Sequence, residues 1–193
     1  NVADCFAIVD IVVIAVSNLH QDEEYLCQYL NLLGAGMKLL IAPHEISEEG
    51  INRLMQSFTV PVVRFSKTTP EEVIRFRVLI IDNIGMLSSL YQYGSIAYIG
   101  GGFGKGIHNI LEAATFGLPV IFGPRYQKFN EAHELVKQGG AFPVVGYPGL
   151  RSILDSLRKD ETLRNSSSVA SGTYIDDNTG ATTRILNHCF DTQ

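Results

Sequence analysis

The sequence predicts an α/β domain of Rossmann-like architecture, in which a parallel sheet has helices on both faces. Two observations predict this fold class. Short runs rich in β-branched residues alternate with amphipathic stretches along the chain. The runs are also predominantly apolar rather than alternating, which indicates strands buried on both faces of a sheet. Alternation of such strands with helices is typical of right-handed crossovers between parallel strands.

The predicted strands are short apolar runs at residues 6–16, 37–42, 62–65, 78–81, 95–99, 119–122 and 141–145. The first run contains Asp10 and is far shorter than the roughly 20 apolar residues that a membrane span requires. We therefore expect a buried strand there.

The predicted helices lie between the strands, at residues 22–33, 47–58, 86–93, 108–116 and 130–138. Ser47 is a typical capping residue at the start of one helix, and Gly117 and Gly139 stand where two helices should end. Pro70 opens a turn. Three more helical patterns follow the last strand, at residues 150–158, 161–170 and 179–190, with a turn at residues 176–178.

The composition is that of an ordinary globular domain and disfavours several classes of protein. The chain has 193 residues, of which 20 are acidic and 15 basic, and it carries no block of Lys or Arg. A binder of nucleic acid or anionic lipid is therefore disfavoured. The three cysteines form no C-x-x-C pair, so neither a zinc site nor a disulfide framework is predicted.

The chain shows no internal repeat and no linker, so residues 1–193 are predicted to form a single domain that ends in helices at residues 150–190. A domain of this length can bury about 70% of its unfolded surface. The sequence opens almost inside its first predicted strand. We therefore expect that the N-terminal part of a larger protein is missing.

Candidate binding residues follow the strands, because ligands of parallel α/β sheets bind outside the carboxyl ends of the strands. Ser17 follows the first predicted strand, His44 the second and Arg125 the sixth. The fifth is followed by Gly-Gly-Gly-Phe-Gly-Lys-Gly-Ile-His-Asn at residues 100–109, which we call the glycine loop.

The glycine loop predicts a phosphate site. Its glycines permit positive φ angles and let backbone N–H groups approach a ligand closely. A helix expected to begin near His108 directs the positive end of its dipole into the loop. Lys105 supplies a mobile positive charge, and His108 and Asn109 supply neutral donors. Glu112 shares a helical face with both and is placed to accept hydrogen bonds from a ribose diol.

A packing turn without a ligand is the alternative explanation of the glycine loop. Walker A does not fit, because Ile99 stands in place of its first glycine and Gly106 in place of its Ser or Thr. G-x-G-x-x-G does not fit either, because Lys105 or Ile107 occupies the place of its third glycine, so a dinucleotide dehydrogenase is disfavoured. The acidic run at residues 22–24 is interpreted as solvated charge that complements a helix dipole.

Residues 100–124 read GGGFGKGIHNILEAATFGLPVIFGP and resemble a signature of the 3-deoxy-D-manno-octulosonic acid (Kdo) transferases of lipopolysaccharide synthesis. That family carries GG-…-G-x-HN-x-LE-x-A-x-x-G-x-P-V-x-x-GP in the C-terminal half of a GT-B glycosyltransferase. Looser matches extend over nearly the whole chain, at Ser17 with the acidic run, at Pro43-His44 and at Phe129-x-Glu131.

The resemblance implies a donor-binding GT-B domain for CMP-Kdo, with a lipid A precursor as the acceptor. It also implies a full-length enzyme on the cytoplasmic face of the inner membrane of a Gram-negative bacterium. In that family the acceptor surface, the membrane anchor and the proposed catalytic base belong to an N-terminal domain. This chain is therefore expected to be soluble and inactive by itself, with no catalytic residue, metal or other cofactor of its own.

On this hypothesis the glycine loop holds the phosphate and Glu112 holds the ribose. Ser17 and His44 line the opposite wall of the donor-binding crevice. The reaction is expected to be an inverting displacement in which backbone donors stabilise the departing phosphate. The predicted donor-binding residues are Ser17, His44, Gly101, Gly102, Phe103, Gly104, Lys105, Gly106, His108, Asn109, Glu112, Arg125 and Glu131.

Other functions remain open at this point. A nucleotide-sugar epimerase of GT-B fold would use the same crevice with a uridine nucleotide, and so would another nucleotide-sugar transferase. A non-catalytic α/β interaction module would use the glycine loop only as a tight turn.

Overall fold

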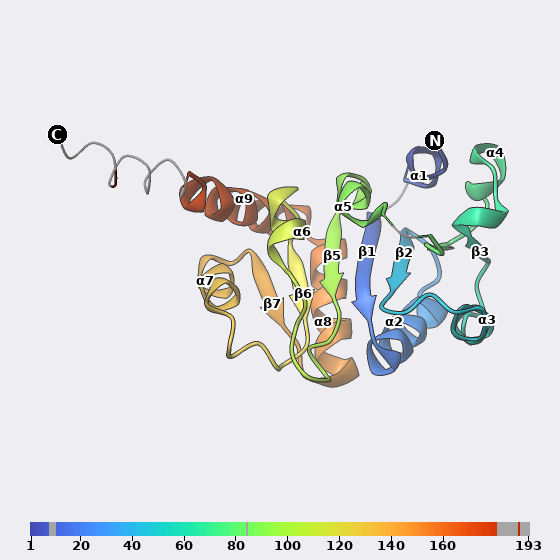
Figure 1. The fold of residues 1–193 in the computed structure, drawn as a ribbon, viewed down its shortest axis with the longest axis horizontal. Coiled ribbons are helices and arrows are strands. Elements are labelled where there is room, and N and C mark those ends of the chain that lie inside the picture. The colour runs from blue at the N-terminus through green and yellow to red at the C-terminus, as the bar shows by residue number, and fades with distance from the viewer. Residues whose placement is uncertain (8–10, 84, 181–188, 190–193) are drawn as a thin grey trace.

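The structure is a computed structural model that describes residues 1–7, 11–83, 85–180 and 189. Within these residues, seven parallel strands form one sheet in the order β3-β4-β2-β1-β5-β6-β7 (Figure 1). The strands are β1 (Ile11–Asn18), β2 (Met37–Pro43), β3 (Val62–Arg64), β4 (Val78–Ile80), β5 (Ile96–Ile99), β6 (Val120–Phe122) and β7 (Ala141–Pro143). The predicted parallel sheet is confirmed.

Helices cover both faces of the sheet, as predicted. One face packs against α2 (His20–Leu32), α3 (Glu48–Ser57) and α8 (Gly146–Lys159). The other face packs against α1 (Val2–Phe6), α6 (Leu111–Thr115), α7 (Asn130–Gln138) and α9 (Glu161–Asn178). Shorter elements are α4 (Pro70–Val73), α5 (Leu87–Leu90) and two 3₁₀ turns at Phe65–Lys67 and Tyr91–Tyr93.

The core consists of two apolar layers, one on each face of the sheet. Neighbouring residues of β1 alternate between them, so that Val13 packs in the layer of Leu30 from α2 and Ile14 in the layer of Leu135 from α7. All four side chains are fully buried. Each such side chain stabilises the fold by roughly 1.5 to 3 kcal/mol, and burial on both faces explains why the strands are mostly apolar.

The start of the first predicted strand, at residue 6, is wrong. Phe6 is instead the last residue of α1 (Val2–Phe6), and β1 begins at Ile11. The reason is a capping box, in which the Asn1 side chain accepts a hydrogen bond from the Asp4 N–H (3.1 Å). Ala3 and Phe6, three residues apart, bury one side of this short helix.

The C-terminal helices also differ from the prediction. α8 begins four residues earlier than expected, at Gly146, and α9 continues through the predicted turn to Asn178. The buried Ser171 of α9 donates a hydrogen bond to the Gly140 carbonyl (3.1 Å), which fixes α9 beside the end of α7. Thr179 and Gly180 are not helical, and the rest of the predicted helix at residues 179–190, apart from Cys189, lies outside the described residues. None of the described helices is both long and apolar enough to cross a bilayer.

Candidate functional site

The two halves of the sheet meet at β1, which pairs with β2 on one side and β5 on the other. Val13 of β1 lies opposite Leu39 of β2 and opposite Ile96 of β5. The loops that follow β1, β2, β5 and β6 therefore gather at one end of the sheet, where parallel α/β proteins bind ligands. In Figure 1 this end lies along the lower edge of the molecule, where the loop after β5 descends near the start of α2.

The glycine loop forms a tight turn around Gly101. Gly101 has a φ of +88°, and a Cβ atom there would lie 2.5 Å from the Gly106 carbonyl oxygen and 2.8 Å from His108 Cδ2. The Gly101 carbonyl accepts hydrogen bonds from the N–H groups of Gly104 (2.8 Å) and Gly106 (3.2 Å). Glycine is required here because the turn leaves no space for a side chain.

Three backbone N–H groups of the glycine loop are left over for a ligand. The N–H groups of Gly102, Phe103 and Lys105 have no hydrogen-bond partner within the part of the chain that the structure describes. Backbone N–H groups in folded proteins normally bond to protein or water. Free amides in a glycine turn at the end of a parallel sheet are suited to binding an anion.

The loop after β6 packs against the glycine loop and forms hydrogen bonds with it. Gly102 and Gly123 are in direct backbone contact, because a Cβ atom on Gly102 would lie 2.6 Å from the Gly123 nitrogen. Arg125 adds two hydrogen bonds, from its N–H to the Gly102 carbonyl (3.0 Å) and from Nη1 to the Gly104 carbonyl (2.6 Å). Arg125 thus holds the loop in shape in this structure, and its contact with a donor stays a prediction.

Asp22, which was not among the predicted donor-binding residues, lies at the centre of the site. Its side chain is 1% exposed, and its carboxylate accepts a hydrogen bond from the Gly101 N–H (3.1 Å). It also accepts from the Leu19 N–H (2.9 Å) and from the Tyr98 hydroxyl (2.6 Å). The interpretation of residues 22–24 as solvated charge is therefore wrong for Asp22.

The same interpretation is wrong for Glu23, which is 8% exposed. Glu23 lies on the wall of a cleft of about 350 Å³ between the starts of α2 and α3, with its Oε2 4.0 Å from Nη2 of Arg53. Burial raises the pKa of Glu23, and Arg53 opposes this shift. His44 also lines this cleft, and Leu19 separates it from Gly104.

The two predicted histidines meet across the site. The rings of His44 and His108 stack with centroids 4.9 Å apart and planes inclined by 33°. Burial lowers the pKa of His108 and His44 lowers it further, whereas the charge of Asp22 acts in the opposite direction. A neutral imidazole has one donor and one acceptor nitrogen, so His108 can donate one hydrogen bond to a ligand.

Ser17 lies close to His44, at the end of β1. Ser17 has a φ of +54°, a left-handed conformation that is uncommon for a residue with a side chain. Ser17, Pro43 and His44 line a cavity of about 180 Å³ at the ends of β1 and β2. The structure therefore brings the two residues predicted for the opposite wall to the same cavity.

The helix after the glycine loop begins at Leu111, three residues later than predicted. His108 and Asn109 therefore precede the helix, and the expected helical face that they share with Glu112 is wrong. Asn109 accepts a hydrogen bond from the Leu111 N–H (3.0 Å), which bends the chain before the helix, and it donates to Glu112 Oε1 (3.0 Å). Because α6 has only five residues, the free loop amides matter more for an anion than the helix dipole does.

The other predicted site residues lie around the loop. The half-buried ring of Phe103 packs edge-on against Tyr25 of α2, with centroids 5.2 Å apart, and Lys105 is exposed. Glu131 lies in the first turn of α7, near Tyr174 of α9, whose pKa is raised first by burial and then by Glu131. The structure therefore places Glu131 near α9, and the role of Glu131 in binding a donor stays a prediction.

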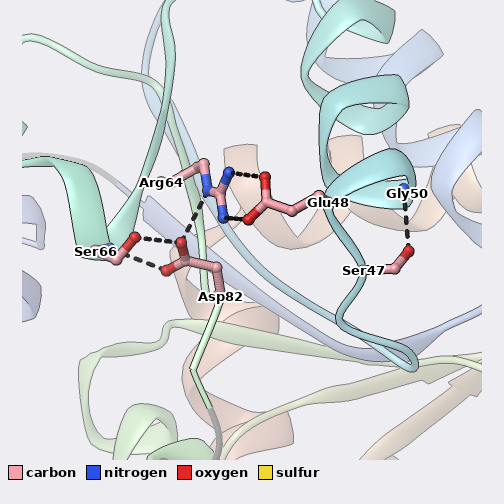
Figure 2. A network of polar contacts seen from close by, with 6 residues as sticks. All are labelled: Ser47, Glu48, Gly50, Arg64, Ser66 and Asp82. Atoms are coloured by element: carbon pink, nitrogen blue, oxygen red, sulfur yellow. Dashed lines mark hydrogen bonds and ion pairs between the residues drawn. The ribbon is translucent and has the colours of Figure 1, made fainter.

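A polar network that the sequence analysis did not predict lies beside this site, at the carboxyl ends of β3 and β4 (Figure 2). Arg64 donates from Nη1 and Nη2 to the two carboxylate oxygens of Glu48, both at 2.7 Å, and from Nε to Asp82 Oδ2 at 2.8 Å. Ser66 donates its N–H (2.9 Å) and its hydroxyl (2.5 Å) to Asp82. The network joins the start of α3, which follows the His44 loop, to two neighbouring strands.

No protein-family profile matches the chain. A curated 3-deoxy-D-manno-octulosonic acid transferase from Aquifex aeolicus is 32% identical over 148 residues, which cover 74% of this chain and 40% of that protein. The match therefore spans less than half the length of this relative.

Solved structures share the fold. The C-terminal CMP-Kdo binding domain of WaaA from Acinetobacter baumannii aligns with a TM-score of 0.77 and 18% identity, over 89% of this chain and 92% of that chain. A UDP-N-acetylglucosamine 2-epimerase aligns with a TM-score of 0.56 and 12% identity, over 95% of this chain and 44% of that chain. At such identities the likeness shows the fold alone.

The fold and the crevice define a Rossmann-like domain of the kind found in the C-terminal halves of GT-B glycosyltransferases. The fold is shared by several families, but the sequence similarity identifies one of them. The chain belongs to the Kdo transferase family, as the resemblance of residues 100–124 predicted.

Proposed function

We propose that this chain is the donor-binding half of an enzyme that transfers Kdo from CMP-Kdo to a lipid A precursor in lipopolysaccharide biosynthesis. The acceptor surface and the catalytic base belong, on this proposal, to an N-terminal domain outside the chain. The full-length protein acts at the cytoplasmic face of the inner membrane of a Gram-negative bacterium. Family membership supports the proposal, and so does a structural relative whose description names CMP-Kdo.

The observation that carries the proposal is the set of free amides in the glycine loop. The N–H groups of Gly102, Phe103 and Lys105 lie in the segment that resembles the family signature, next to the stacked His44 and His108. An anion bound there would meet backbone donors, one imidazole N–H and the mobile ammonium of Lys105. This chemistry suits the phosphate of a nucleotide sugar.

The same donors explain how the domain would assist the reaction. When the bond between the sugar and the phosphate breaks in an inverting displacement, negative charge grows on the departing phosphate. Preorganised N–H donors stabilise this charge more than they stabilise the bound donor, which lowers the barrier. The domain therefore binds and activates the donor, and we expect it to transfer no Kdo when it is incubated alone with CMP-Kdo and acceptor.

Calorimetric titration of the chain with CMP, UMP and UDP tests the proposal. We expect CMP to bind more tightly than either uridine nucleotide. Tighter binding of UDP would instead support the epimerase or another nucleotide-sugar transferase, which the shared fold leaves open. Absence of binding by all three nucleotides would support an interaction module in which the glycine loop is only a turn.

Glu112 provides a prediction within the site. If its carboxylate binds the ribose diol, Glu112→Gln lowers CMP affinity by about 1.5 to 3 kcal/mol, roughly tenfold to a hundredfold, because the charge-assisted part of each hydrogen bond is lost. Glutamine keeps an oxygen that can accept the Asn109 hydrogen bond, so the melting temperature should barely change.

Titration of both proteins with CMP and 2′-deoxy-CMP checks the role of Glu112. The parent should discriminate against the deoxy ligand, and Glu112→Gln should largely lose this discrimination. Equal discrimination by both proteins would remove Glu112 from the ribose site.

A further inference from the structure

Asp22 is a buried charge whose surroundings exceed what a helix cap requires. Its side chain is 1% exposed, and no Lys, Arg or His of the described residues forms an ion pair with it. Burying a carboxylate without a cation is costly unless hydrogen bonds satisfy it. Here three donors from three segments do so: the Leu19 N–H before α2, the Tyr98 hydroxyl of β5 and the Gly101 N–H of the glycine loop.

Only one of these hydrogen bonds belongs to a helix cap. The bond from the Leu19 N–H joins positions three residues apart and stabilises the first turn of α2. The bonds from Tyr98 and Gly101 join Asp22 to segments 76 and 79 residues away. An aspartate needed only as a cap would not have to be buried under the glycine loop.

The Gly101 peptide is the point through which Asp22 can control the loop. Its N–H is bound to Asp22, and its carbonyl accepts from Gly104 and Gly106, so fixing this peptide fixes the turn. A Cβ atom on Gly101 would lie 2.8 Å from Cδ2 of His108, so the Gly101 backbone packs directly against the His108 ring. Movement of this one peptide would therefore shift both the free loop amides and the imidazole.

We propose that Asp22 is the positioning residue of the donor site, which holds the glycine loop through Gly101 and keeps His108 in a defined place and charge environment. This inference rests on the proposed function of the loop as the phosphate site. Asp22 itself does not touch the donor. It determines where the groups that do so are located.

The charge of Asp22 should affect the titration of His108, which can be measured separately from CMP binding. Among the described residues, the titratable groups that act on the charge of His108 are His44, from the loop after β2, and Asp22, from α2. Burial and His44 lower the pKa of His108, and Asp22 raises it. Removing the charge of Asp22 should therefore move the titration of His108 to lower pH, whereas a loss of packing alone should not.

The test compares Asp22→Asn with Tyr98→Phe as the matched control. Asparagine keeps the size of Asp22 but replaces one acceptor oxygen with a donor, so it cannot serve all three donors. Tyr98→Phe removes one hydrogen bond and leaves both the charge and the Gly101 contact. We expect Asp22→Asn to weaken CMP binding roughly tenfold or more and to lower the His108 midpoint in an NMR pH titration. Tyr98→Phe should leave the His108 midpoint unchanged and CMP affinity within about threefold.

Parental CMP affinity and a parental His108 midpoint in Asp22→Asn would overturn the proposal and leave Asp22 as a helix cap. Equal losses of affinity in both variants with unchanged midpoints would also overturn it, in favour of packing.

Amide exchange in the parent chain provides a check that needs neither variant nor ligand. The Gly101 N–H should exchange slowly, and those of the less buried Phe103 and Lys105 quickly. Fast exchange at Gly101 would refute the anchoring role, whereas failure of the parent to bind CMP would refute the proposed function.

Discussion

Gly102→Ala is expected to destabilise the chain by about 2 to 3 kcal/mol and to lower its melting temperature by roughly 5 to 10 °C. The added Cβ atom would lie 2.6 Å from the nitrogen and 2.7 Å from the Cα of Gly123, inside the backbone of the neighbouring loop. Neither segment can yield easily, because both directly follow strands in the middle of the sheet. CMP binding should fall as well, since the Gly102 N–H is one of the free loop amides.

Gly104→Ala is the matched control for this variant. A Cβ atom on Gly104 would meet the flexible end of the Leu19 side chain at 2.9 Å and the Gly101 carbonyl oxygen at 3.4 Å. We expect less than about 1 kcal/mol of destabilisation, with any effect confined to nucleotide binding. Thermal melting and CMP titration of both variants provide the measurement. Equal stability of the two variants would show that the contact between Gly102 and Gly123 is loose.

Arg64→Ala is expected to cost about 3 kcal/mol of stability at neutral pH. Arg64 donates to Asp82, whose side chain is 1% exposed, so the substitution leaves a buried carboxylate without its cation (Figure 2). Breaking a buried ion pair from one side typically costs about 3 to 5 kcal/mol, and the two remaining bonds from Ser66 favour the lower end of that range. Glu48→Gln is the control. The side chain of Glu48 is 74% exposed, so solvent screens its pair with Arg64 and its substitution should change stability little.

The dependence on pH identifies the cause of the Arg64 effect. Burial alone would raise the pKa of Asp82, but hydrogen bonds from Ser66 and Arg64 lower it below the ordinary value of 3.8. A lowered pKa means that ionised Asp82 stabilises the fold above that value and that this stability is lost as the pH falls through the pKa of the folded state.

The difference in stability between the parent and Arg64→Ala should therefore be large at pH 7 and shrink below pH of about 4. Urea unfolding at several pH values measures this difference. If the difference is the same at neutral and acid pH, Arg64 acts through its apolar stem rather than through its charge.

The sequence predicted the strands well because their identity depends on local composition. Runs such as Met37–Pro43 are apolar at every position except Lys38, and a sheet covered on both faces leaves no other place for them. The errors arose where a few polar contacts decide the structure. Asn1 caps the short helix that includes Phe6, the predicted first residue of a strand, and Asn109 delays the start of α6 by three residues.

The candidate site was predicted in outline for a similar reason. Strand ends and glycine density identify the glycine loop, and the structure brings His44 and His108 together as the parallel sheet requires. The burial of Asp22 could not be predicted, because it depends on Gly101 and Tyr98, which are distant in the sequence. The ion pair of Asp82 could not be predicted for the same reason, since its partner Arg64 comes from a different strand.

The order of the strands also determines when this site can form during folding. β1 and β2 are joined by one short crossover, whereas the contact between Asp22 and Gly101 closes 79 residues of chain. Long closures carry a larger entropic cost and tend to form late. Intermediates that contain only the first half of the sheet should therefore lack the crevice. A bound nucleotide should then stabilise the completed domain by mass action, by about 2.7 kcal/mol at a hundred times its Kd, and leave such intermediates unaffected.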